Sequence, residues 1–154
     1  MVKINLILLL LISPPIHAFT NELRQIEREI EAINTQVFWA DSHPLCKEGL
    51  LGAYIPKLDK IFICQANHKK DYEELVGTLK HEGWHAVQNK CNKNLAVLND
   101  EKLRAHLKPR DRKNLHLYHP GTERAEAEAR VIEQIPTKAW IKGFRHYCKN
   151  FKSN

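Results

Sequence analysis

The chain has 154 residues, which is enough for one domain with one hydrophobic core. It contains 24 lysines and arginines against 18 aspartates and glutamates, and its formal net charge is +6. Because the two signs are interleaved and no nucleic-acid-binding motif is present, we expect no nucleic-acid partner, although the basic balance permits contact with an anionic surface. No segment after residue 18 is apolar over the roughly 20 residues that a membrane span needs.

Residues 1–18 have the pattern of a secretory signal peptide. Lys3 supplies the positive start, residues 4–12 are almost wholly apolar, and Ser13 with two prolines interrupts this run before Ala18, a suitable cleavage residue. An uncleaved N-terminal anchor is the alternative. We therefore expect an exported protein, secreted or periplasmic, whose mature part is residues 19–154.

The four cysteines support the same compartment, since an even number of cysteines in an oxidising environment indicates disulfides. Three pairings are open. We favour Cys46 with Cys64, which closes a hairpin-like segment, and Cys91 with Cys148, which ties the end of a central helix to the last helix. Free thiols are the alternative if the chain is cytosolic.

The expected elements begin with a helix over about residues 21–36, whose apolar stripe is Leu23, Ile26, Ile30 and Ile33. Two short strands are predicted over 50–55 and 60–65, with Pro56 in the turn between them. Further on we expect a short helix over 100–107 and a basic irregular stretch over 108–113. A helix capped by Thr122 should run to about residue 134, and a last helix should follow Pro136 over 137–151.

A central helix is predicted after Asp71, an N-cap residue with Glu74 at the third helical position. Its apolar positions form one stripe, and His81 and His85 lie about 120° or more from the centre of that stripe. The residues of the stripe are Tyr72, Leu75, Val76, Leu79, Gly83, Ala86 and Val87. Gly83 costs about 1 kcal/mol relative to alanine within a helix, so either another element approaches closely there or the glycine is merely tolerated.

Within this helix, residues 81–85 read H-E-x-x-H. Histidines four residues apart share a helix face, so His81 and His85 can both bind one zinc ion, while Glu82 can take a proton from a water that the metal activates. Two surface histidines on a charged helix are the alternative interpretation.

A catalytic zinc needs a third protein ligand, and residues 123–130 offer Glu123, Glu126 and Glu128. Here the chain resembles the gluzincin zinc metallopeptidases, in which H-E-x-x-H is completed by a glutamate on a later helix. In several small members that glutamate opens an E-x-E-A pattern, which residues 126–129 match. The resemblance implies Glu126 as the ligand, with Glu123 as the alternative and Glu128 as a weaker one. Those families usually continue with Asp or Asn, whereas this chain has Arg130, at the position of a residue that bonds to a ligand histidine.

The resemblance also implies a fold. We expect a zincin-like α+β structure over residues 19–154, predominantly helical, with a short β-hairpin or small sheet before the metal helix. It further implies that the strand directly before that helix, over residues 61–64, is a sheet edge along which an extended peptide binds.

The function implied is a secreted zinc peptidase with one Zn²⁺ per chain, a peptide or protein substrate and Glu82 as the general base. Candidates for stabilising the oxyanion are His106, His116, Tyr118, His119 and Arg124, among which Tyr118 and His119 are favoured because they precede the ligand helix. The alternatives are a non-catalytic secreted zinc-binding protein and a disulfide-stapled interaction protein of the cell envelope.

Overall fold

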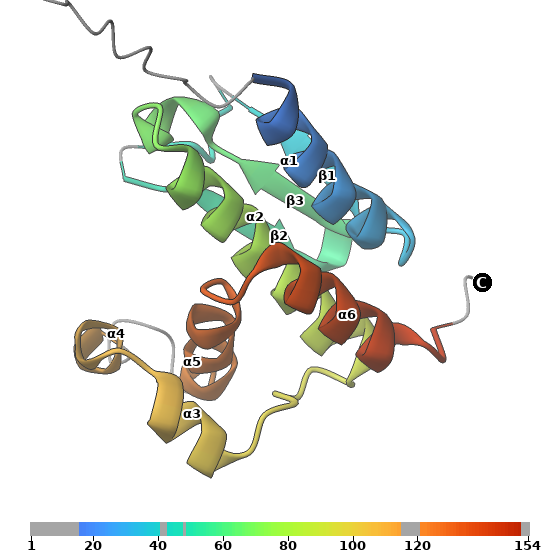
Figure 1. Cartoon of the computed structure of the whole chain (residues 1–154), viewed down its shortest axis with the longest axis vertical. Coiled ribbons are helices and arrows are strands. Elements are labelled where there is room, and N and C mark those ends of the chain that lie inside the picture. The colour runs from blue at the N-terminus through green and yellow to red at the C-terminus, as the bar shows by residue number, and fades with distance from the viewer. Residues whose placement is uncertain (1–15, 41–42, 48, 115–120, 152–154) are drawn as a thin grey trace, which may run out of the picture.

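The computed structural model describes residues 16–40, 43–47, 49–114 and 121–151 (Figure 1). Its helices and strands follow in the order α1 (Ile16–Glu31), β1 (Gln36–Trp39), β2 (Gly52–Ile55), β3 (Lys60–Ile63), α2 (Tyr72–Ala86), α3 (Asp100–His106), α4 (Pro109–Asn114), α5 (Glu123–Ile132) and α6 (Thr137–Cys148). Short 3-10 turns occur at η1 (Pro56–Leu58) and η2 (Gln65–His68), and a π-helical turn, η3 (Val87–Cys91), continues α2. The predicted α+β class is confirmed: the chain is one mostly helical domain with a small mixed sheet.

The sheet has the strand order β1-β3-β2, with β1 parallel and β2 antiparallel to β3. The predicted hairpin of β2 and β3 is present, but β1 was not foreseen as a separate strand. The first helix was predicted to continue to residue 36, whereas α1 ends at Glu31 and Asn34 adopts a left-handed conformation (φ 56°) that turns the chain into β1. Asparagine tolerates this conformation better than most residues, so it stops the helix.

The strand directly before the metal-motif helix, β3, is not an edge. It pairs with a neighbour on each side, and Ile61 and Ile63 are fully buried. The expectation that this strand offers its edge to a peptide is therefore wrong. The edge strand that contacts α2 is β2, because β1 occupies the other side of β3 and the sequence motif carries no information about that parallel pairing.

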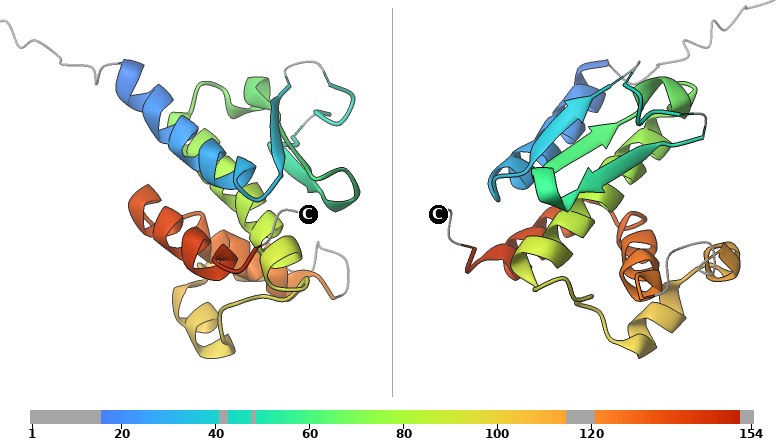
Figure 2. Two further views of the ribbon diagram at one scale, coloured as in Figure 1. Left: turned by 90° about the vertical axis from the view of Figure 1, so that its right-hand side faces the viewer. Right: turned by 180° about the vertical axis from the view of Figure 1, so that it is seen from behind.

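One core joins the sheet to α1, α2 and α6, which lie close together in both views of Figure 2. Gly83 of α2 lies at the centre of this packing. A Cβ atom there would stand 2.9 Å from Ile30 Cδ1 and 3.0 Å from Trp140 Cζ2. The glycine of the motif thus reflects a close approach of α1 and α6 rather than mere tolerance.

The segment after the central helix differs from the prediction in one place. The stretch 108–113, expected to be irregular, forms α4, in which Pro109 occupies the first helical position and Asp111 is buried. Proline suits that position because the first amide of a helix has no acceptor within the helix. The helix expected over 100–107 is present as α3, and α5 and α6 end two or three residues before their predicted ends.

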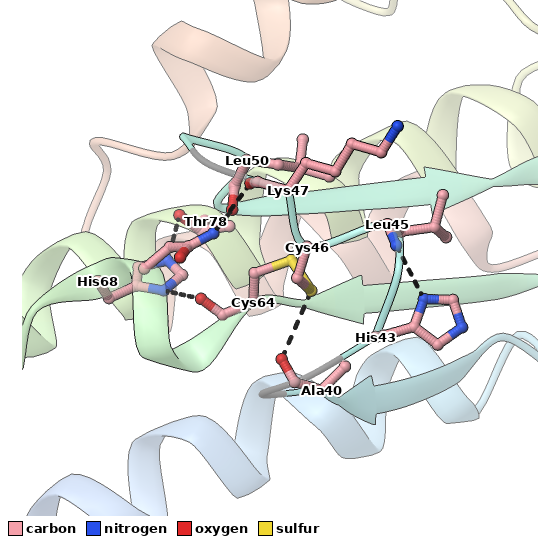
Figure 3. Close-up of a disulfide and its surroundings, with 10 residues drawn as sticks. Ala40, His43, Leu45, Cys46, Lys47, Leu50, Cys64, His68 and Thr78 are labelled. Carbon is pink, nitrogen blue, oxygen red and sulfur yellow. Dashed lines mark hydrogen bonds between the residues drawn. A yellow bond between two sulfur atoms is a disulfide. The ribbon is translucent and has the colours of Figure 1, made fainter.

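Both predicted disulfides are present, Cys46–Cys64 and Cys91–Cys148. The first links the loop before β2 to the residue after β3 (Figure 3). The Cys64 carbonyl accepts a hydrogen bond from His68 Nδ1 (2.9 Å), and His68 Nε2 lies 3.0 Å from Thr78 Oγ1 on α2. Because a carbonyl only accepts, Nδ1 carries the proton and the Thr78 hydroxyl donates to Nε2. The bridge, the sheet and α2 are thereby connected.

Residues 1–15 of the predicted signal peptide lie outside the described residues, and α1 begins at Ile16, ahead of the expected cleavage after Ala18. Cleavage there would leave α1 from Phe19 onward. Among the described residues, no helix combines the length and the apolar character needed to cross a membrane. The two disulfides are compatible with an oxidising compartment.

Candidate metal centre

The centre is built on the second half of α2. Asp71 caps the helix as predicted, its Oδ1 accepting from the Glu74 amide at 3.0 Å. The apolar stripe of α2 enters the core, while α5 packs against a different face. His81 lies away from the stripe, and Glu82 lies at its edge beside β2; both are buried, with 5% and 9% of their surface exposed.

Three metal-ligand groups converge between α2 and α5. The Nε2 atoms of His81 and His85 lie 3.2 Å apart. Each of them lies 3.3 Å from a carboxylate oxygen of Glu126, His81 from Oε2 and His85 from Oε1. The structure thus brings together the three residues that the sequence and the gluzincin resemblance nominated as ligands.

The far side of each imidazole has its own partner. His81 Nδ1 lies 2.8 Å from Glu133 Oε2, and His85 Nδ1 lies 2.8 Å from Gln88 Oε1. A carboxylate and an amide oxygen only accept, so both Nδ1 atoms carry the ring proton. In the neutral rings the two Nε2 atoms then present lone pairs to each other and to Glu126. The two ring nitrogens and the two carboxylate oxygens repel one another at this separation unless a cation, a proton or a metal ion, lies among them.

The pKa shifts of His81 and Glu126 also indicate that a positive charge is favoured among these groups. Burial by itself lowers the pKa of His81, but hydrogen bonds to Glu126 and Glu133 outweigh it and raise this pKa to about 9. Burial likewise opposes ionisation of Glu126, yet its hydrogen bonds to His81 and His85 hold the pKa of its carboxyl well below the usual range. A proton on His81 therefore balances the charge that a bound metal ion would otherwise balance.

Two other glutamates nominated for the metal are engaged elsewhere. Glu123 accepts from the Gly121 amide at 2.6 Å and is not part of the cluster. Glu128 is fully buried on a different side of α5, where it binds Trp84 and the Leu98 amide. Among the three candidate carboxylates, only Glu126 faces the histidines.

Of the five oxyanion candidates, only Arg124 and His106 lie within the described residues, and both are engaged away from the centre. Tyr118, His119 and His116 lie outside the described residues. Arg124 forms an ion pair with Asp100 and donates to the Leu98 carbonyl at 2.7 Å. His106 is exposed and bonds to the Lys102 carbonyl. Neither Arg124 nor His106 lines the cleft described next.

A cleft of about 390 Å³ opens onto the three ligand groups. Its lining includes the segment 49–54, which contains the start of the edge strand β2, and also Arg130 and Glu133. Glu82 lies in this cleft with its Oε2 2.8 Å from the Tyr54 amide. A larger hollow of about 750 Å³ adjoins the cleft and shares Arg130 and Glu133 with it.

Sequence reasoning missed three residues around the centre: Gln88, Arg130 as a cleft residue, and Glu133. Glu133 comes seven residues after Glu126, two turns along the same face, so an acidic residue in phase with the ligand was a signal that could have found it. Glu133 makes the bond to a ligand histidine that the resemblance assigns to position 130, while Arg130 lies 3.3 Å from Glu133. Although position 130 does not carry the Asp or Asn that the resemblance implies, Glu133, about one turn later, supplies an acceptor for His81 Nδ1.

Comparison with known proteins identifies a family for this chain. No curated protein and no solved structure is significantly similar to this chain. A family model described as a domain of unknown function, DUF8637, matches residues 16–149. Since this match spans most of the chain, the protein belongs to that family.

Proposed function

We propose that this protein is a secreted zinc-dependent peptidase that uses His81, His85 and Glu126 as metal ligands. The observation that carries the proposal is the convergence of these groups, each histidine oriented from behind by a hydrogen-bond acceptor. Because the Nδ1–H group of each neutral ring donates to that acceptor, its Nε2 atom is left with a lone pair, which is what binding to a metal ion requires.

The donor set suits zinc. Two imidazole nitrogens and one carboxylate oxygen form a common catalytic zinc ligand set, which leaves a fourth position open. In a tetrahedron with metal–ligand bonds of about 2.0–2.1 Å, neighbouring ligand atoms are about 3.3–3.4 Å apart. The two Nε2 atoms, 3.2 Å apart, agree with that spacing, and each lies 3.3 Å from a different oxygen of Glu126. One ligand atom from each of the three residues lies within 4.8 Å of the other two.

Zinc bound there would polarise a carbonyl group and bring the pKa of a water to about 7. Glu82 would accept the proton of the attacking water and return it to the leaving amine. Its burial in the cleft wall, next to the ligands, supports this role. Arg130 is an arginine that lines the cleft, and it would stabilise negative charge on the substrate carbonyl oxygen.

An extended peptide would lie along β2, the antiparallel edge strand that lines the cleft. The Tyr54 amide points away from β3 and is bonded to Glu82. A peptide pairing with β2 would compete for that amide and free the Glu82 carboxylate for proton transfer.

Metal content and activity of the disulfide-intact protein test the proposal. We expect about one zinc per chain, lost in His81→Ala, and hydrolysis of a mixed peptide library. Glu82→Gln should retain zinc while its rate falls by about 10²–10⁴-fold, the usual contribution of a general base. A wild type that lacks zinc would refute the metal centre, and full activity in Glu82→Gln would refute the base. Zinc binding without hydrolysis would favour the non-catalytic zinc-binding protein.

A further inference from the structure

Glu128 is a fully buried carboxylate that takes no part in the metal cluster. It receives hydrogen bonds from Trp84 Nε1 at 2.6 Å, the Leu98 amide at 2.6 Å and Gln88 Nε2 at 3.0 Å. An indole N–H, a backbone amide and an amide NH₂ can only donate, so both oxygens of Glu128 act as acceptors towards these partners. A buried polar group is costly unless its hydrogen bonds are made, so this arrangement has little freedom to rearrange.

The orientation of the Gln88 amide follows from Glu128. Gln88 Nε2 faces two acceptors, Glu128 Oε1 and the Ala125 carbonyl, each at 3.0 Å. The amide nitrogen must therefore stay on that side, and Oε1 must point to His85 Nδ1, 2.8 Å away. A flipped amide would place its oxygen against both acceptors and its NH₂ against a ring N–H.

The consequence for His85 is a single tautomer. With Oε1 of Gln88 as its partner, Nδ1 of His85 must carry the proton, and Nε2 is left with its lone pair towards His81 and Glu126. Gln88 is 4% exposed and belongs to the π-helical turn η3, whose last residue, Cys91, is bonded to α6 through Cys148. The amide is thus held at both its side chain and its backbone.

We propose that Glu128 and Gln88 are positioning residues that set the affinity of the metal centre through His85. The proposal rests on the proposed zinc site. It differs from the role of Glu133, which contacts His81 directly: Glu128 touches no ligand and acts only by orienting Gln88. Glu128, which the sequence analysis considered as a third ligand, would thus support the metal ion indirectly, through Gln88 and His85.

Zinc affinity, measured by competition with a chelator, and the visible absorption of the cobalt-substituted protein test this role. Gln88→Leu should weaken zinc binding by about 10–100-fold, the usual effect of removing such a partner, and should alter the cobalt spectrum. Glu128→Gln should weaken binding in the wild-type background but have no further effect in the Gln88→Leu background, because the carboxylate acts through that amide. Gln25→Leu, an exposed substitution on α1, is the control and should bind zinc like the wild type.

The outcomes separate this role from the metal centre itself. Wild-type affinity in folded Gln88→Leu, or additive effects in the double variant, would overturn the positioning role while the zinc site stands. If the wild type binds no zinc, the proposed function and this role both fail. Should Gln88→Leu not fold, Gln88→Met, which lacks the amide but keeps its length and flexibility, carries the same expectation.

Discussion

His81 is held from both sides of its ring, by Glu126 at Nε2 and by Glu133 at Nδ1. The second contact shows how one departure from a motif can be compensated nearby. Position 130 carries an arginine, and a glutamate one turn later takes over the bond while the arginine pairs with it. At the scale of single residues, a hydrogen-bond acceptor is therefore present behind His81 although position 130 carries an arginine.

Removing the Glu133 carboxylate should weaken the metal centre. Glu133→Ala leaves His81 Nδ1 without its acceptor, and we expect zinc affinity to fall by about 10–100-fold. Glu101→Ala, an exposed substitution on α3, is the control. Unchanged zinc affinity in Glu133→Ala, measured by chelator competition, would contradict an orienting role for this carboxylate.

The stability of the metal-free protein should fall as the pH rises from about 6.5 to 9. The folded protein raises the His81 pKa from 6.5 to about 9, so its contribution is complete below 6.5 and is lost as the pH passes through the folded value. The lowered pKa of Glu126 acts in the opposite range: its contribution is present above the ordinary value of 4.5 and is lost on acidification below it.

Urea unfolding of chelator-treated protein at several pH values measures this loss. His81→Gln, which cannot take up the proton, should show a smaller decline on the alkaline side, and added zinc should oppose the decline in the wild type because it replaces the proton. A metal-free wild type that is as stable at the alkaline end as at the acidic end of this range would contradict the charge balance described for the centre.

The contact of β2 with α2 shapes the cleft at the scale of elements. Gly52 begins β2, and a Cβ atom there would lie 2.7 Å from Thr78 Cγ2 and 3.2 Å from Glu82 Cγ. The strand can therefore approach the helix, and Tyr54 can bond to Glu82, only because position 52 has no side chain. The loop before β2 is held in turn by the Cys46–Cys64 bridge and by Asn67, which donates to the Leu50 carbonyl at 2.6 Å.

Gly52→Ala should force β2 away from α2. We expect a destabilisation of about 1–3 kcal/mol, as for overpacked sites, together with a loss of peptide hydrolysis. Gly77→Ala is the matched control, because a Cβ atom there would contact nothing within 4 Å and alanine favours the helix by about 1 kcal/mol. Equal unfolding free energies for Gly52→Ala and the wild type would show that the approach is not as close as described.

At the scale of the whole molecule, two disulfides hold the two ends of the core. Cys46–Cys64 spans 18 residues and lies beside the sheet, whereas Cys91–Cys148 spans 57 residues and joins η3 to α6. Apart from the main core, α5 and the α3 region share a small hydrophobic cluster formed by Leu103, Leu107, Ala127 and Val131. The candidate metal centre lies where α5 meets α2, between this smaller cluster and the main core.

Removal of each bridge by paired alanine substitution should lower the unfolding free energy by about 3–4 kcal/mol. In the chain-entropy model the loss of Cys91–Cys148 costs about 1 kcal/mol more, because its loop is longer. Urea unfolding of the two double variants measures the difference. A larger loss for the Cys46–Cys64 variant would mean that native contacts around the sheet, rather than chain entropy, dominate its effect.

Local patterns were sufficient for much of this structure. The cap at Asp71, the stripe of α2 and the pairing of the cysteines all appear as predicted, since each depends on residues close in sequence or on few alternatives. The cluster of His81, His85 and Glu126 was also nominated in advance, the histidines from helical spacing and the glutamate from the gluzincin resemblance.

Long-range pairing decided the rest. The parallel β1 made β3 a central strand and left β2 as the edge at the cleft, and no motif encodes that order. The way α5 packs on α2 places Glu126, and not Glu123, next to the two histidines. The same packing buries Glu128 against Gln88 and brings Glu133 to His81. A helix face offers several acids at similar depth, so only the angle and height at which two helices pack determine which carboxylate meets which partner.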